Sequence, residues 1–249
     1  MYNNRPVSKR ENQRVILFFH GGGFVWGDIE IYDNLCSKIA RKTGSVLVSV
    51  EYRLAPEYPY PYAIKDSWGI LLWASDNIIK YGGNPRKVTV MGDSAGGNIS
   101  AVLSVISREK GAPEIESQVL IYPLTMFIDT LTPSRKYFIY ENERDFVLSD
   151  DFLLRADHAY LRNNENRRDP TISPHFAPVD SLYPRALIIT AQCDPLRDEG
   201  KEYAGILHDA GVRVEYFEGK GMMHGFVSFY QALKEGRKAI NEVADFIEE

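Results

Sequence analysis

Two shortages in the sequence each exclude a class of protein. The chain has only two cysteines, Cys36 and Cys193, which lie far apart and in no metal-ligand spacing. This usage favours buried free thiols in a reducing compartment over a disulfide framework or a structural zinc site. No apolar run approaches the ~20 residues that a membrane-spanning helix needs. We therefore expect a cytoplasmic protein that does not enter a membrane.

A strong net charge and an apolar leader are missing as well. The formal net charge is −5 over 249 residues, which argues against a nucleic-acid or anionic-membrane partner. Residues 1–14 are polar and basic without an apolar stretch, so they do not form a secretory signal. Hydrophobic residues make up 44% of the chain, enough for one large core, and we find no internal repeat or low-complexity linker. We predict a single domain spanning residues 1–249.

The chain does contain a regular alternation of short apolar runs and segments with helical spacing. The apolar runs predict buried strands at residues 14–19, 46–50, 88–91, 117–122, 185–191 and 212–217. Helical spacing fills the intervals, with predicted helices that end at Gly44, Gly82, Gly111 and Gly211 and a last helix at the C-terminus. Strands separated by helices predict an α/β fold, a mostly parallel sheet covered by helices on both faces. Active groups then belong at the carboxyl ends of the strands.

Residues 124–168 interrupt this alternation. Aromatic and charged residues mix there without a clear period, and the segment is too long for a plain connection. We interpret it as a cap-like insertion with its own helix near residues 149–161, placed over the site.

The sequence Gly92-Asp93-Ser94-Ala95-Gly96 stands between a predicted strand and a predicted helix. Glycines at both ends of Gly-x-Ser-x-Gly permit a sharp strand-to-helix turn that exposes the Ser94 hydroxyl. The helix N-terminus behind it aims backbone N–H groups at an anion formed beside Ser94. Alone the motif is a weak signal, because small residues cluster in ordinary turns. Asp93 cannot point the same way as Ser94 on a tight turn, so we interpret it as a structural hydrogen-bond acceptor.

A second glycine-rich segment, His20-Gly21-Gly22-Gly23-Phe24, follows the first predicted strand. Consecutive glycines cost backbone entropy, so a use for them is expected. One use is a loop whose N–H groups face a reacting oxygen without side chains in the way. The alternative for an isolated loop of this kind is a flexible turn.

A base and an acid for Ser94 come from chain order. A serine hydroxyl needs an imidazole to accept its proton, and the imidazole needs a carboxylate at its far nitrogen. Of the five histidines, His224 lies in a loop after the last predicted strand, and Asp194 ends the strand before that one. The order serine, aspartate, histidine is the one used with a nucleophile elbow. We interpret Asp198 and Glu199 as favourable charges at a helix N-terminus.

Five segments together resemble one known family. They are His20–Phe24, Tyr52–Glu57, Gly92–Gly97, Asp194–Gly200 and His224–Phe226. In these segments the chain resembles the hormone-sensitive-lipase-like branch of the α/β-hydrolases, which includes bacterial carboxylesterases. The resemblance implies Ser94 as nucleophile, His224 as base, Asp194 as its partner, and an oxyanion hole from the N–H groups of Gly22, Gly23 and Ala95. It also implies serine-esterase activity on short-chain carboxylic esters, with no metal or cofactor.

The chain departs from that family ahead of the glycine loop. Members usually carry a helical cap there, whereas nineteen residues precede His20, so we expect a reduced or absent N-terminal cap. We then expect a wide, solvent-open mouth beside Ser94, edged by Phe24, Trp26 and aromatic residues of the insertion. Exposed aromatic residues of this kind favour either loose substrate selection or a homodimer.

Two alternatives to an esterase remain at this point. An amidase or arylformamidase would use the same three residues, and the sequence does not separate these activities. A different class is a small-ligand receptor on a hydrolase scaffold, such as the plant gibberellin receptors, which have lost the catalytic histidine. The presence of Ser94, Asp194 and His224 together favours an enzyme.

Overall fold

The computed structural model describes residues 2–3, 11–127, 132–141, 148–162 and 165–249. Its central sheet has seven strands in the order β1-β3-β2-β4-β5-β6-β7. The strands are β1 (Tyr2–Asn3), β2 (Gln13–Phe19), β3 (Val46–Val50), β4 (Gly83–Asp93), β5 (Ser117–Ile121), β6 (Arg185–Cys193) and β7 (Val214–Met223). Strand β1 pairs antiparallel with β3, and all other neighbours pair parallel. The predicted α/β class is confirmed.

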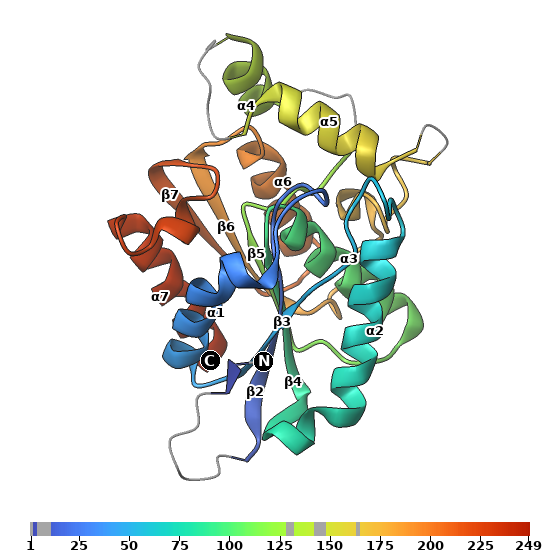
Figure 1. Ribbon diagram of the computed structural model, residues 1–249, viewed down its shortest axis with the longest axis vertical. Coiled ribbons are helices and arrows are strands. Elements are labelled where there is room, and N and C mark those ends of the chain that lie inside the picture. The colour runs from blue at the N-terminus through green and yellow to red at the C-terminus, as the bar shows by residue number, and fades with distance from the viewer. Residues whose placement is uncertain (1, 4–10, 128–131, 142–147, 163–164) are drawn as a thin grey trace.

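Helices cover both faces of this sheet (Figure 1). They are α1 (Ile29–Thr43), α2 (Tyr62–Asn77), α3 (Ala95–Lys110), α4 (Pro133–Arg135), α5 (Asp150–Tyr160), α6 (Arg197–Asp209) and α7 (Lys234–Glu248). Shorter helical turns are η1 (Ile78–Tyr81), η2 (Lys136–Glu141), η3 (Pro174–Phe176) and η4 (Phe226–Phe229). Helices α1 and α7 pack on one face, whereas α2, α3 and α6 pack on the other.

Strand β2 is apolar along most of its length because helices cover both of its faces. Ile16 and Phe18 point to the face covered by α1 and α7, and Leu17 and Phe19 point to the opposite face. Successive strand residues alternate between faces, so a strand covered on both sides must be apolar at every position. Each fully buried side chain of this size contributes about 1.5–3 kcal/mol to stability. The strand is therefore a rigid support for the glycine loop that follows it.

The last strand is longer than the sequence predicts. Strand β7 runs to Met223, whereas the apolar pattern ends at Phe217. The continuation contains Gly219, where an added Cβ would lie 2.6 Å from the ring of Phe226. A glycine needed for packing against an aromatic ring thus resembles a loop residue in the sequence. As a result, His224 directly follows a strand.

One thiol is more exposed than expected, and one leucine of α2 faces solvent. Leu72 is exposed, because adjacent helix positions differ by about 100° and the buried stripe of α2 runs through Leu71 instead. Cys193 is half-buried, whereas Cys36 is buried as predicted, and both are free thiols.

The insertion lies beyond one end of the sheet, at the top of Figure 1. Its helix α5 begins after Ser149, whose hydroxyl accepts a hydrogen bond from the Phe152 N–H at 3.2 Å. This agrees with the helix predicted near residues 149–161. Phe146 of the insertion, and residues 1 and 4–10 of the stretch ahead of β2, lie outside the described residues.

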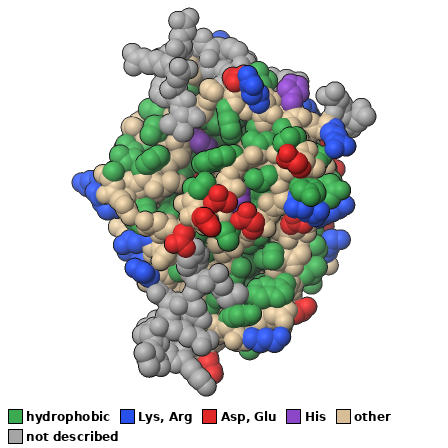
Figure 2. Space-filling model, in the orientation of Figure 1, with side chains coloured by type: hydrophobic (Ala, Val, Ile, Leu, Met, Phe, Trp, Pro, Cys, Tyr) green, Lys and Arg blue, Asp and Glu red, His purple; other side chains and the backbone are tan. Residues whose placement is uncertain are grey.

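The surface and the helices bear on two classes of partner, nucleic acids and membranes. Figure 2 shows Asp and Glu side chains near the centre of the viewed face and Lys and Arg side chains mainly toward its margins. Among the described residues, the basic side chains on this face are therefore spread along its edges. Within the described ranges, no helix combines the length and the apolar character needed to span a bilayer.

Candidate active site

Ser94 occupies a strained turn between β4 and α3. Its backbone has φ 54° and ψ −116°, a conformation that costs free energy for a residue with a side chain. An added Cβ at Gly92 would lie 2.3 Å from the carbonyl of Gly96, and one at Gly96 would lie 1.9 Å from the carbonyl oxygen of Phe19. Both glycines are therefore required by close backbone contacts. The turn is held by the Ser94 N–H, which donates to the Ile121 carbonyl at 2.8 Å.

His224 links Ser94 to Asp194. Its Nε2 lies 2.9 Å from the Ser94 Oγ, and its Nδ1 lies 2.7 Å from the Asp194 Oδ2. The second carboxylate oxygen of Asp194 accepts from the Leu196 N–H at 2.9 Å. Asp194 is fully buried and His224 nearly so. The structure thus brings the three residues selected from the sequence into one chain of hydrogen bonds.

Electrostatics at His224 favour the protonated imidazole. Burial lowers the pKa of His224, but the charge of Asp194 and its hydrogen bond to Nδ1 outweigh burial, so the pKa is raised above its usual value. Asp93 and Glu199 raise the pKa further through their charges. The imidazole can accept a proton from Ser94 and hold it beside a buried carboxylate.

The glycine loop, residues 20–24, lines the same pocket as Ser94 and His224. Gly22 and Gly23 have φ of 110° and 63°, and an added Cβ at Gly22 would lie 1.9 Å from the Trp26 carbonyl oxygen. The backbone N–H groups of Trp26 and Val25 donate to the Gly22 carbonyl oxygen at 3.0 and 3.1 Å. Among the described residues, the N–H groups of Gly22, Gly23 and Ala95 donate to no protein acceptor. They are free to bind a developing negative charge.

Phe24 does not lie at the mouth, which corrects the expectation from the sequence. It is 1% exposed and stacks on Tyr160, with ring centroids 3.8 Å apart and planes 9° apart. Its carbonyl accepts from the Ala55 N–H at 2.8 Å. A positive φ of 65° at Phe24 accompanies this inward course of the chain. The side chain joins the glycine loop to the end of α5 and is not available to a substrate.

A pocket of about 640 Å³ opens beside Ser94 and His224. Trp26 lines it and is 57% exposed, in agreement with its expected place at the mouth. Phe152 of α5 supplies an aromatic residue of the insertion, and Ile31 and Phe229 extend the apolar lining to the surface. The site is therefore open to solvent and mostly apolar.

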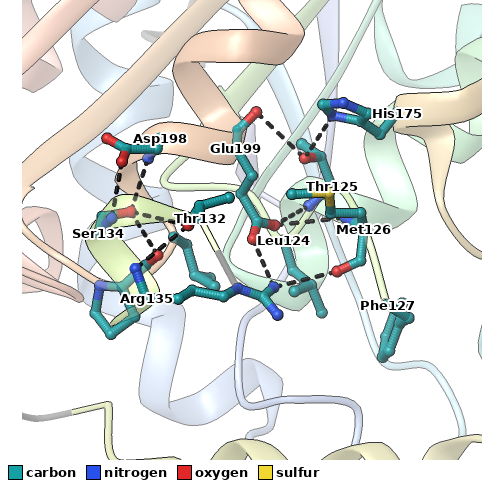
Figure 3. A network of polar contacts seen from close by, with 12 residues as sticks. Leu124, Thr125, Met126, Phe127, Thr132, Ser134, Arg135, His175, Asp198 and Glu199 are labelled. Atoms are coloured by element: carbon teal, nitrogen blue, oxygen red, sulfur yellow. Dashed lines mark hydrogen bonds and ion pairs between the residues drawn. The ribbon is translucent and has the colours of Figure 1, made fainter. Parts of the chain in front are cut away.

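Glu199 and Asp198 do more than charge a helix N-terminus, and this also corrects the sequence interpretation. Figure 3 shows Glu199 in a polar network with the segment after β5 and with α4. The Glu199 carboxylate is fully buried, accepts from the Thr125 N–H at 2.7 Å, and pairs with Arg135 at 2.5 Å. Asp198 accepts from the Ser134 N–H at 2.8 Å. Burial raises the pKa of Glu199, and the charge of Arg135 opposes that rise.

No pattern in the sequence indicates this network. An acid in the first turn of a helix has the same pattern whether it faces solvent or an arginine 64 positions away. The Arg135–Glu199 pair fastens the insertion to the start of α6, three residues after Asp194. It thus connects the cover of the pocket to the loop that carries the acid.

The interpretation of Asp93 as a structural acceptor is confirmed. Its carboxylate accepts from the Gly21 N–H at 2.8 Å and from the Tyr32 hydroxyl at 3.0 Å. Burial raises the pKa of Asp93 to about 6, which the Tyr32 hydrogen bond only partly offsets. Tyr32 was not selected from the sequence, since a tyrosine in an amphipathic helix usually belongs to the core.

Known proteins resemble this chain in sequence and in structure. A family model described as alpha/beta hydrolase fold matches residues 16–228. The chain is 40% identical to carboxylesterase NlhH of Mycobacterium tuberculosis over 230 residues, covering 90% of this chain and 70% of that protein. It is 33% identical to an arylesterase of Saccharolobus solfataricus, covering 88% of this chain and 70% of that protein.

Solved structures agree. A hyperthermophilic esterase from the archaeon Pyrobaculum calidifontis superposes with a TM-score of 0.93 at 39% identity, covering 99% of this chain and 77% of that chain. The resemblance to the hormone-sensitive-lipase-like branch, expected from five short segments, is confirmed over most of the chain. The chain belongs to the α/β-hydrolase fold family.

Proposed function

We propose that the protein is a serine carboxylesterase that hydrolyses short-chain carboxylic esters through an acyl-enzyme on Ser94. The observation that carries this proposal is the hydrogen-bond chain from Ser94 Oγ through His224 to Asp194, at 2.9 and 2.7 Å. It lies beside an open, mostly apolar pocket. Esterases among the relatives, including the one 40% identical, support the same reaction.

In the acylation step, Ser94 Oγ attacks the ester carbonyl carbon while its proton passes to His224 Nε2. Asp194 accepts the Nδ1–H and stabilises the imidazolium. The carbonyl oxygen becomes an oxyanion that the N–H groups of Gly22, Gly23 and Ala95 bind. When the intermediate collapses, the bond to the alcohol oxygen breaks, and Nε2 donates its proton to the leaving alcohol.

Deacylation repeats the sequence with water. His224 takes a proton from water, whose oxygen attacks the acyl carbon, and the same N–H groups bind the second oxyanion. The bond to Ser94 Oγ then breaks, and Oγ recovers its proton from Nε2. One ester and one water give one acid and one alcohol, and the enzyme is unchanged.

The test is a matched substrate panel. p-Nitrophenyl esters of graded acyl length should be hydrolysed, with a preference for short chains, and the corresponding p-nitroanilides should react far more slowly. Faster anilide than ester turnover would favour an amidase. Absence of turnover on every substrate, with no labelling of Ser94 by an organophosphate, would favour a non-catalytic receptor.

We extend the proposal to location and assembly. The free thiols of Cys36 and Cys193 support a cytoplasmic protein, and the exposed Trp26, Ile31 and Phe229 around the pocket support a homodimer. Cell fractionation tests the first point. Light scattering that gives the 28.3 kDa mass of one chain at micromolar concentration would contradict the second.

A further inference from the structure

Asp93 is a buried acid for which the proposed reaction has no use. It is the last residue of β4, next to Ser94, and is 3% exposed. Its two carboxylate oxygens accept from the Gly21 N–H at 2.8 Å and from the Tyr32 hydroxyl at 3.0 Å. That hydroxyl also lies 3.2 Å from the Gly21 nitrogen. The three groups form a closed polar triangle behind the glycine loop.

The triangle holds one end of a single peptide group. The N–H of Gly21 and the carbonyl of His20 belong to the same planar peptide unit. Its carbonyl oxygen accepts from the Tyr52 hydroxyl at 2.7 Å, while its N–H donates to Asp93. Both ends of the unit are thus fixed, and rotation of this plane would break a buried hydrogen bond. The next two peptide units carry the N–H groups of Gly22 and Gly23.

The backbone of Gly21 lies directly against the Asp93 carboxylate. An added Cβ there would lie 2.6 Å from the Asp93 Oδ2, so only glycine brings the loop backbone onto the carboxylate. The carboxylate faces His224, Tyr32, Tyr52, Tyr122 and Cys36, and among the described groups no arginine or lysine pairs with it. A charged acceptor makes a stronger hydrogen bond to an N–H than a neutral one, at the cost of burying its charge.

We propose that Asp93, with Tyr32, is a positioning residue that orients the His20–Gly21 peptide so that the N–H groups of Gly22 and Gly23 face the oxyanion. The inference rests on the proposed esterase function. It assigns to the residue before the nucleophile a role in placing the loop from the neighbouring strand. Ser94 and its oxyanion donors are thereby fixed to each other through a side chain on the same strand as the nucleophile.

The experiment compares Asp93→Ala, Asp93→Asn and Tyr32→Phe with a matched control, Ser117→Ala. Ser117 makes a buried hydrogen bond to Thr89 at 2.8 Å, at the opposite end of the sheet from Ser94. For each variant, kcat and KM on p-nitrophenyl acetate are measured, together with the inhibition constant of a trifluoromethyl ketone and the Tm. The ketone adds to Ser94 and leaves an oxyanion against the loop, so its affinity reports on the donors.

For Asp93→Ala, kcat should fall on the order of 10²–10³-fold with little change in KM, and the ketone should bind weaker by a similar factor. Asp93→Asn keeps an acceptor for Gly21, so kcat and ketone affinity should each fall by about three- to tenfold, as they should in Tyr32→Phe. Ser117→Ala should lower Tm and leave both kinetic constants and ketone affinity unchanged.

The Tm of Asp93→Asn separates positioning from a merely structural role. Because the folded pKa of Asp93, about 6, lies above that of an unfolded aspartate, ionisation costs stability at pH 8, and this cost fades as the pH falls through that pKa. Asparagine removes the cost, so Tm should not fall while ketone affinity does. A lower Tm with unchanged ketone affinity would overturn the inference.

The remaining outcomes are also decisive. If Asp93→Ala folds and keeps kcat and ketone affinity within about threefold, the loop does not depend on Asp93. If it does not fold, Asp93→Asn and Tyr32→Phe decide through their ketone affinity. If wild-type protein neither hydrolyses the acetate nor is labelled at Ser94, the proposed function fails. Normal wild-type activity with unaffected variants refutes this inference alone.

Discussion

The two halves of the candidate site are held by different means. Ser94, Asp194 and His224 each follow directly after a strand, namely β4, β6 and β7. The parallel sheet fixes the positions of these strand ends relative to one another. The insertion is instead held largely by side-chain contacts, among them Arg135 on Glu199.

The proposed reacting residues and the insertion that covers the pocket therefore differ in how firmly they are held. Strand ends are fixed by many backbone hydrogen bonds and by a core on both faces, so a single substitution elsewhere barely moves them. The insertion depends on a few contacts, among them the stacking of Tyr160 on Phe24. Changes in the first half should therefore act on kcat, and changes in the second on stability and KM.

The largest effect is expected at Ser94. Ser94→Ala removes the nucleophile, and kcat on an activated short ester should fall by on the order of 10⁴-fold or more with the fold unchanged. Steady-state kinetics and circular dichroism check this. A folded variant with more than about a tenth of wild-type activity would remove Ser94 from the mechanism.

The next effects are expected at the base and its partner. His224→Ala removes the proton acceptor, whereas Asp194→Asn leaves the imidazole but disturbs its tautomer, so the second change should be severe yet milder. The kcat values of the two variants should keep that order. Equal activity of Asp194→Asn and wild type would show that the strand-end half does not act as one unit.

Arg135→Met tests the other half. It leaves the Glu199 carboxylate buried without its cation, which typically costs about 3–5 kcal/mol of unfolding free energy. Chemical denaturation measures the loss, and kcat should change far less than in the two preceding variants. The double variant Arg135→Met with Glu199→Gln removes the stranded charge and should recover part of the stability. An Arg135→Met variant as stable as wild type would show that the Arg135–Glu199 pair does not hold the insertion.

The same division explains what the sequence could predict. Strands such as 46–50 and 185–191 were readable because a strand covered on both faces must be apolar throughout. The proposed nucleophile, acid and base could be selected because each comes directly after such a strand, in a fixed order along the chain. Fold and chemistry therefore depend on local pattern and on order.

The cover depends on partners far away in the chain. Phe24 looks like a mouth residue in a glycine loop, yet its burial depends on Tyr160, 136 positions later. Glu199 looks like an ordinary first-turn acid until Arg135 is placed beside it. A local sequence pattern does not indicate which distant residues an insertion will contact. The Phe24–Tyr160 and Arg135–Glu199 contacts could therefore not be predicted from one sequence.

A smaller effect concerns pH. The imidazole must be neutral to accept the Ser94 proton, so kcat/KM falls as the pH drops through the pKa of His224. Because that pKa is raised, the acid limb should lie above the usual histidine value of 6.5. Asp93→Asn and Glu199→Gln each remove a charge that raises the pKa, so both should move the limb to lower pH. A flat wild-type profile down to about pH 4, with the protein folded, would argue against His224 as base.

The smallest effect is expected at the pocket mouth. Trp26 is more than half exposed and lines the pocket. Trp26→Ala removes apolar contact that is equal in ground and transition states, so KM should rise by about two- to tenfold with kcat nearly unchanged. Leu182, 72% exposed and outside the pocket lining, provides the matched control, since Leu182→Ala should change neither constant. A fall in kcat as large as that of Asp194→Asn would place Trp26 with the chemistry and would break the division between the two halves.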